Sequence, residues 1–156
     1  MSETAIQENK QVVADFFTAL NAGFNAPDRS LAEEWARYLA ADVIDHNKII
    51  FGEGDEPGAA VEGFRQQLAA FSNGNGEGGL FVQDLIGEGG RVVARLNVRG
   101  THTGYHPRMP EPTGRDCDVE QIWIFTVADR KITEIRAVSD RLSMFLQLGW
   151  AWPTAD

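Results

Sequence analysis

Cysteine is almost missing from this chain, which has 156 residues and a single cysteine, Cys117. A lone cysteine cannot form an internal disulfide, and this fits a reducing compartment. Two of the three histidines, His102 and His106, are four residues apart. Gly104 lies between them and Pro107 follows, and both residues oppose the helix on which such a pair would share a metal ion. We therefore expect no metal and no other cofactor.

Long apolar runs and excess positive charge are also missing. No apolar stretch approaches the roughly 18 residues that a membrane span requires, and the first five residues are too polar for a signal peptide. The chain has 14 Lys and Arg against 23 Asp and Glu, a formal net charge of -9. This charge repels the phosphates of nucleic acid and anionic membrane surfaces. We expect a soluble, cytoplasmic protein that binds neither nucleic acid nor membranes.

The rest of the composition is ordinary for a globular protein, with 43% hydrophobic and 24% charged residues. The length predicts a single domain over residues 1–156. One glycine-rich segment, 72–79, interrupts the chain, and we interpret it as a flexible loop inside that domain. It lacks the spacing of a phosphate-binding loop.

Hydrophobic periodicity predicts an α+β fold. Apolar residues three and four apart indicate helices over 6–20, 30–41 and 58–71. Alternating apolar and polar residues indicate strands over 80–86, 91–101, 116–127 and 131–138, with a short extended segment at 43–47. This order predicts a cone-shaped, curved antiparallel sheet with three N-terminal helices packed on its concave face. The open end of such a cone is a natural ligand pocket.

Several short motifs follow one another along the chain. They are Asp45-His46-Asn47, Gly100-Thr101-His102-Thr103-Gly104, Pro112-Thr113-Gly114-Arg115, Glu120-Gln121-Ile122 and Gln147-Leu148-Gly149. In this order they resemble the SnoaL-like polyketide cyclases, which have the nuclear-transport-factor-2-like fold. The resemblance implies a pocket for a small apolar or aromatic polyketide-like carbonyl compound, and a homodimer or larger homo-oligomer.

The resemblance also implies an acid/base pair that this chain lacks. In the cyclases a histidine follows Glu-Gln-Ile, and an aspartate follows the arginine matched by Arg136. These residues serve an intramolecular aldol closure, which needs a base at an acidic carbon and a donor at the enolate oxygen. Trp123 and Ala137 stand at the two positions here. Neither side chain can take a proton from carbon.

Strand alternation predicts which side chains share the interior with these two positions. If Trp123 and Ala137 point inward, then Gln121, Phe125, Thr133 and Ile135 do as well, while Glu120 and Arg136 point outward and could form a cross-strand ion pair. The candidate substrate-binding residues are Phe17, Asn47, Gln121, Trp123, Phe125, Ile135 and Ala137. The aromatic residues among them could equally be plain core.

Three residues remain as candidates for the missing acid/base chemistry. His46 and His102 can exchange protons near neutral pH or donate a hydrogen bond to an oxyanion. The alternative is a structural role, in which His46 caps a turn and His102 ends a strand. Asp140 could replace the missing base, but it is also well placed to cap the closing segment 141–148. Asp45 has a similar but weaker claim.

These observations support an enzyme that acts by acid/base chemistry on a polyketide-like carbonyl compound, as a cyclase, isomerase or hydroxylase-type protein. The loss of both proton-transfer residues supports an alternative, a non-catalytic ligand-binding or accessory protein on the same fold. A third possibility is an interaction module, which would present a large exposed apolar patch on the outer sheet face.

Overall fold

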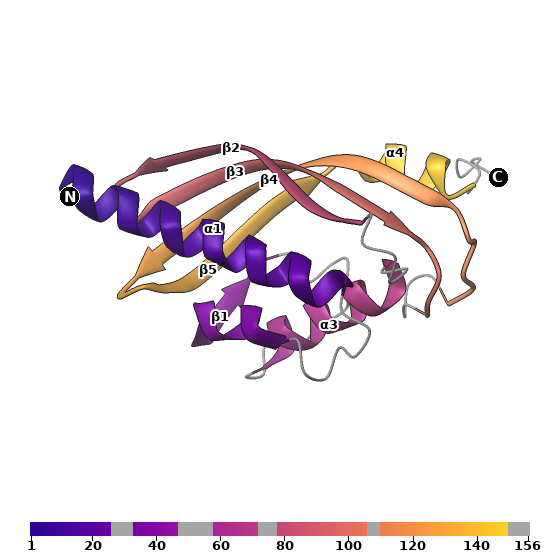
Figure 1. Ribbon diagram of the computed structural model, residues 1–156, viewed down its shortest axis with the longest axis horizontal. Helices are drawn as coiled ribbons and strands as arrows, with labels where there is room; N and C mark the ends of the chain where they lie inside the picture. The colour runs from indigo at the N-terminus through magenta and orange to yellow at the C-terminus, as the bar shows by residue number, and fades with distance from the viewer. Residues whose placement is uncertain (26–32, 47–57, 72–77, 106–109, 150–156) are drawn as a thin grey trace.

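The fold is α+β, as Figure 1 shows for the computed structural model, which describes residues 1–25, 33–46, 58–71, 78–105 and 110–149. In chain order the elements are α1 (Glu3–Asn25), the 3-10 helix η2 (Glu33–Tyr38), β1 (Leu39–Asp45), α3 (Ala59–Phe71), β2 (Gly79–Glu88), β3 (Arg91–Thr101), β4 (Asp116–Ala128), β5 (Lys131–Ser139) and α4 (Arg141–Gln147). None of the helices in these ranges has both the length and the apolar character that crossing a membrane requires.

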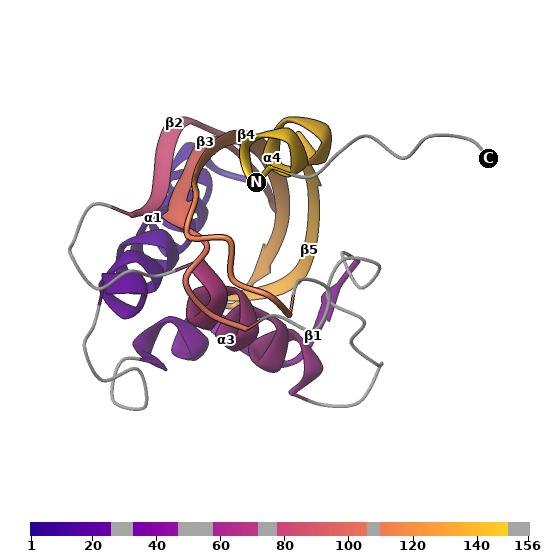
Figure 2. The ribbon, with the colours of Figure 1, turned by 90° about the vertical axis from the view of Figure 1, so that its right-hand side faces the viewer.

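The five strands form one curved, open sheet in the order β1-β5-β4-β3-β2. The prediction of a purely antiparallel sheet is wrong at one edge, because β1 pairs with β5 in parallel. The other three pairings are antiparallel. Figure 2 shows the strands arching over α1 and α3, with α4 at the opposite side of the sheet. The predicted helices therefore do lie on the concave face.

The first two helices differ from their predicted bounds. We expected the first helix to cover residues 6–20, but α1 begins at Glu3 and continues to Asn25. The Asn21 amide does not end the helix, because it donates to Leu80 O (2.9 Å) and accepts from Leu80 N (2.7 Å) on the edge strand β2. The second helix is a short 3-10 turn, and the strand begins at Leu39, where pairing with Ile132 replaces further helix. The predicted start of that helix, at residue 30, lies outside the described residues.

Aromatic side chains from the helices and from β4 form the centre of the core. Phe16 makes edge contacts with Phe17, Phe64 and Phe125, at ring-centroid distances of 5.4, 5.8 and 6.0 Å. Trp35 from η2 packs on Phe64 at 5.5 Å. Edge-to-face contacts of this kind add to the free energy gained by burying the rings. This cluster holds the three helices against the concave face.

The end of α3 meets the end of β3 through direct backbone contacts. The N–H groups of Thr103 and Gly104 both donate to Ala70 O, each at 3.0 Å. A Cβ at position 104 would lie 2.3 Å from Ala69 O and 3.2 Å from Ala69 C, so only glycine fits. The same approach holds His102 beside α3.

We expect Gly104→Ala to lower the free energy of unfolding by about 3 kcal/mol, because a backbone clash cannot be relieved by a side-chain movement. Gly90→Ala is the matched control, since its nearest atom, Val127 O, would lie at an ordinary 3.5 Å. Urea denaturation of both variants checks this. Equal losses in the two variants would mean that α3 and β3 are not packed this closely.

Candidate functional site

His102 is fully buried at the point where β3 ends on α3, with 0% of its surface exposed. Its ring packs on Phe71 at a centroid distance of 5.4 Å and an interplanar angle of 30°. Its backbone N–H donates to Arg115 O and its carbonyl accepts from Gly114 N, at 2.9 and 2.8 Å. The Gly100–Gly104 and Pro112–Arg115 motifs therefore lie side by side and enclose this histidine.

The hydrogen bonds of His102 determine its tautomer. The backbone N–H of Thr113 donates to Nδ1 at 3.2 Å, so Nδ1 presents a lone pair. The single ring proton of the neutral imidazole is then on Nε2. Nε2 is buried, and no described residue accepts a hydrogen bond from it. Buried donors are normally paired, and within the described part of the chain this N–H has no acceptor.

Two further polar side chains lie on the inner face of β4. Trp123 donates its Nε1–H to Gln121 Oε1 at 2.7 Å, and Gln121 Nε2 donates to Ser139 Oγ at 3.1 Å. Trp123 is directly paired with Ala137 on β5. The alternation predicted these positions to face inward, and Gln121 and Trp123 are buried while Ala137 is half-buried. The indole N–H is thus already occupied within the chain.

The other predicted substrate-binding residues belong to the apolar core. Phe17, Phe125 and Ile135 are all buried within the main core cluster. Thr133 departs from the predicted alternation because β5 has a bulge there: Ile132 pairs with Val127 and Glu134 with Thr126. Asn47 lies outside the described residues.

Asp140 is an N-cap. Its carboxylate accepts the backbone N–H of Ser143 at 3.1 Å, and α4 starts at the next residue. Its own N–H donates to Glu120 O at 3.1 Å. The exposed position at the strand end gives it the structural role that the sequence offered as an alternative.

Helix α4 is docked on β4 through Gln147. Beyond the end of β5, the Gln147 side chain donates to Asp118 O at 3.0 Å and accepts from Asp118 N at 2.6 Å. It thereby pairs with the β4 backbone as a strand would. Leu148 next to it is buried in the core, so the Gln147-Leu148-Gly149 motif serves to dock α4.

His46 lies on the outer side of the sheet, away from the buried side chains of β4. Its Nε2 contacts Glu134 Oε1 at 2.6 Å, and both side chains are about one-third exposed. Its backbone N–H donates to Ile135 O at 2.9 Å. Arg136 and Thr126 also contact the Glu134 carboxylate, at 3.4 Å each. These contacts fasten the end of β1 to β5.

Removing the Glu134 charge tests how much the contact between Glu134 and His46 stabilises the pairing of β1 with β5. The hydrogen bond with His46 holds the pKa of the Glu134 carboxyl below its ordinary value. A lowered pKa contributes stability above the unfolded-state value of about 4.3 and loses it as the pH falls through the folded value. We expect Glu134→Gln to be less stable than the parent at pH 7 and equally stable well below pH 4. Urea unfolding at both pH values measures this, and a pH-independent difference would contradict it.

Asp45, which the sequence ranked below Asp140 as a candidate, is buried. It is 6% exposed and pairs with the fully buried Ile135, so it faces inward, whereas its neighbour Ile44 is exposed. Asp45, His102 and Gln121 are the buried polar or charged residues among those described. The alternation of Ile44, Asp45 and His46 indicates that Asp45 faces the opposite side from its two neighbours. Three residues do not by themselves show which of the two sides is inside.

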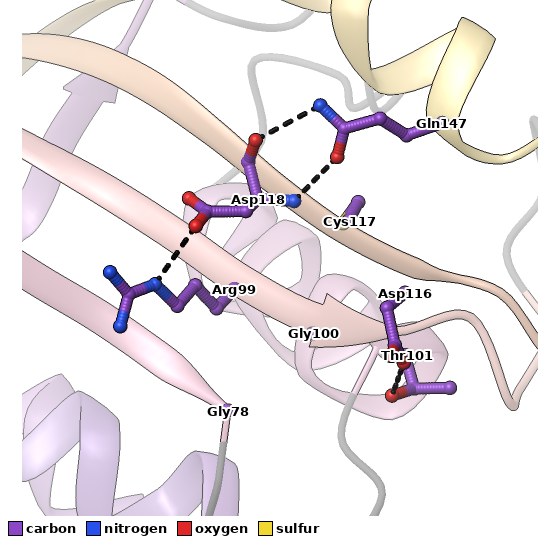
Figure 3. A pocket seen from close by; sticks show the side chains of 8 residues that line it. All are labelled: Gly78, Arg99, Gly100, Thr101, Asp116, Cys117, Asp118 and Gln147. Atoms are coloured by element: carbon purple, nitrogen blue, oxygen red, sulfur yellow. Dashed lines mark hydrogen bonds and ion pairs between the residues drawn. The ribbon is translucent and has the colours of Figure 1, made fainter.

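A polar hollow of about 290 Å³ lies on the outer face of β3 and β4, with α1 and α3 behind the sheet in Figure 3. Arg99 and Asp118 are paired there at 3.1 Å, and the Thr101 hydroxyl donates to Asp116 at 2.6 Å. Cys117, between the two aspartates, is buried, and this burial raises the pKa of its thiol to about 11. A thiol that stays protonated at neutral pH is no nucleophile.

The remainder of the outer face combines ion pairs with apolar side chains. The predicted pair between Glu120 and Arg136 is wrong: Glu120 contacts Arg95 at 3.3 Å and Arg136 contacts Glu134. Beside them Ile122, Ile124 and Val138 are exposed, Val138 by 75%. Among the described residues, no group of three or more His, Cys, Asp or Glu side chains is arranged to hold a metal ion.

Comparison with known proteins connects this geometry to one family. The model of the SnoaL-like polyketide cyclase family matches residues 8–148. The aklanonic acid methyl ester cyclases DauD of Streptomyces sp. (strain C5) and DnrD of Streptomyces peucetius are 40% and 33% identical over 119 residues, which is 76% of this chain and 69% and 77% of theirs. A crystal structure from Jannaschia sp. CCS1, assigned to SnoaL-like cyclases, superposes with a TM-score of 0.72 at 21% identity, covering 98% of this chain and 99% of that one.

Proposed function

This chain belongs to the SnoaL-like polyketide cyclase family, and from that premise we propose that it is a cyclase-like enzyme acting on a polyketide-like carbonyl compound. The observation that carries the proposal is the buried His102 Nε2–H, for which no described residue is an acceptor. A fixed donor in a site removed from water stabilises negative charge on a carbonyl oxygen. His102 would therefore hold the oxygen on which charge develops.

The tautomer restricts what His102 can do in this reaction. Because Nδ1 already accepts the Thr113 N–H, the ring donates from Nε2 and has no free basic nitrogen. It is therefore an electrophilic donor and cannot also be the base that removes the proton from carbon. The base must be another group.

The departure from the family pattern changes the space at two neighbouring positions. Trp123 and Ala137 are cross-strand partners, so the histidine and aspartate of the cyclases would stand side by side at these positions. A large indole beside a methyl group occupies that space and narrows it. That indole already packs on Phe17, Phe64 and Phe125 at ring-centroid distances of 5.5, 5.8 and 5.7 Å, so at these two positions the space of the acid/base pair is taken up by the core.

The names of the curated relatives suggest aklanonic acid methyl ester as the first compound to test. The purified protein would be titrated with it while tryptophan fluorescence is followed, and product would be quantified by mass spectrometry in the same samples. Saturable quenching together with an isomeric, cyclised product is the expected result. If neither quenching nor product is observed, this compound and its close analogues are not the substrates of the protein.

The alternative function is a non-catalytic binding or accessory protein, and the pairing of Trp123 with Ala137 is the observation that favours it. Saturable quenching with the compound returned unchanged would support this alternative. In either case the homodimer that the resemblance implies would cover the apolar side chains of Ile122, Ile124 and Val138 on the outer face.

A further inference from the structure

We propose that Thr113 is a positioning residue for His102: its hydroxyl group donates to Nδ1 and so keeps the single ring proton on Nε2. The inference rests on the proposed function, because it concerns the hydrogen-bond donor of that same site. It adds a side chain that need not touch the substrate, but that sets the protonation and the orientation of the ring that does.

Two donor groups of Thr113 lie beside one nitrogen of the imidazole. The backbone N–H donates to His102 Nδ1 at 3.2 Å, and Thr113 Oγ1 lies 3.3 Å from the same atom. Thr113 Oγ1 also accepts the backbone N–H of Arg115 at 3.3 Å. A hydroxyl oxygen that accepts one hydrogen bond still has its own proton to donate. Because the backbone N–H requires a lone pair on Nδ1, the proton between Oγ1 and Nδ1 belongs to the hydroxyl group.

Backbone hydrogen bonds hold Thr113 in this place. The residues directly after it are joined to His102 itself, since His102 N–H donates to Arg115 O at 2.9 Å and Gly114 N–H donates to His102 O at 2.8 Å. Gly114 has a φ of 68°, a left-handed conformation that glycine adopts without strain. On the other side, Phe71 packs on the ring at a centroid distance of 5.4 Å. The imidazole is therefore held both by Thr113 at Nδ1 and by Phe71.

These contacts distinguish the two tautomers of the neutral imidazole. With the proton on Nε2, the Nδ1 atom of His102 accepts from both donors of Thr113. With the proton on Nδ1, that N–H would face the Thr113 backbone N–H, which would lose its acceptor, and Nε2 would present a lone pair. A lone pair repels an oxygen on which negative charge develops, whereas an N–H stabilises it. The Thr113 contacts thus favour the tautomer that the proposed function requires.

The test compares Thr113→Val with the parent protein. Valine has nearly the shape of threonine but no hydroxyl group, so the ¹⁵N chemical shift of His102 Nδ1 in the free protein should move toward that of an imidazole nitrogen with fewer hydrogen bonds. With aklanonic acid methyl ester, kcat should fall roughly five-fold, the equilibrium factor of one net hydrogen bond, and KM should change little. Thr113→Ser keeps the hydroxyl group and should restore both the shift and the rate. Thr113→Ala should behave as Thr113→Val does, and it replaces that variant if valine disturbs the fold.

Thr18→Val is the matched control. Thr18 is exposed on α1 and its hydroxyl donates to Ala14 O at 3.1 Å, so the same chemical change is made away from His102. It should leave the Nδ1 shift and kcat at their parental values.

An unchanged Nδ1 shift in folded Thr113→Val would overturn the inference and leave the proposed function standing. A lower thermal stability with parental shift and rate would mean that the hydroxyl group serves only as the acceptor of the Arg115 N–H, and this too would contradict the inference. If the parent protein binds the compound without turnover, the proposed function fails, while the Nδ1 shift still decides whether Thr113 holds the ring.

Discussion

Replacing His102 by asparagine is expected to lower kcat by about 10²–10³-fold, the usual cost of removing one donor to a developing oxyanion. The Oδ1 atom of asparagine can still accept the Thr113 N–H, which Nδ1 accepts in the parent protein. The shorter side chain places nothing at the Nε2 position. The variant therefore keeps this hydrogen bond but loses the Nε2 donor and the ring contact with Phe71. Steady-state turnover of aklanonic acid methyl ester measures the loss of rate, and thermal unfolding measures the loss of packing.

His102→Gln is the control for this substitution. Glutamine reaches farther than asparagine, so its amide N–H₂ can stand near the position of Nε2 and donate there. We expect it to retain a substantial part of the parent rate. If the asparagine variant is as active as the parent, or if both variants lose activity equally with reduced thermal stability, His102 supports the fold and not the reaction.

The second large effect concerns stability and the aromatic core. Phe16→Ala should lower the free energy of unfolding by about 3–5 kcal/mol. Phe16 is 0% exposed, and its removal leaves a cavity bordered by the rings of Phe17, Phe64 and Phe125. Such a loss is a large part of the 5–15 kcal/mol that typically stabilises a domain. Urea denaturation followed by tryptophan fluorescence measures it.

Phe145→Ala makes the same chemical change at a different place. Phe145 is on α4 and is 36% exposed, so we expect a loss of less than about 1.5 kcal/mol, since much of its ring area already contacts water. A similar loss in both variants would mean that Phe16 is not at the centre of the core.

Strand positions could be predicted closely because alternation is a local property of the sequence. The strand predicted over 91–101 is observed as Arg91–Thr101, and the strands predicted over 116–127 and 131–138 are observed as Asp116–Ala128 and Lys131–Ser139. The parallel pairing of β1 with β5 could not be predicted in the same way. It joins Leu39 to Ile132, and nothing within either segment specifies a partner so far along the chain.

The candidate site was predictable to the extent that it follows from strand alternation. The inward positions of Gln121 and Trp123 follow from the alternation of apolar and polar residues along β4, and both side chains are buried. The roles of His46 and Asp45 did not follow, because the segment that contains them is short and its register on β5 decides which of the two faces inward. For Asp140 the sequence favoured a cap and kept a base as the alternative, and the Ser143 N–H on its carboxylate is the contact of a cap.

Nitrogen NMR of the protein with ¹⁵N-labelled histidine, before and after addition of aklanonic acid methyl ester, tests the donor role of His102. We expect free His102 to carry its proton on Nε2, and binding to shift this N–H while the ring nitrogens of His46 stay unchanged. His102→Gln identifies the signals. A proton on Nδ1 of His102, or a ligand-induced shift at His46 alone, would contradict the donor role of His102 and the placement of the site on the concave face.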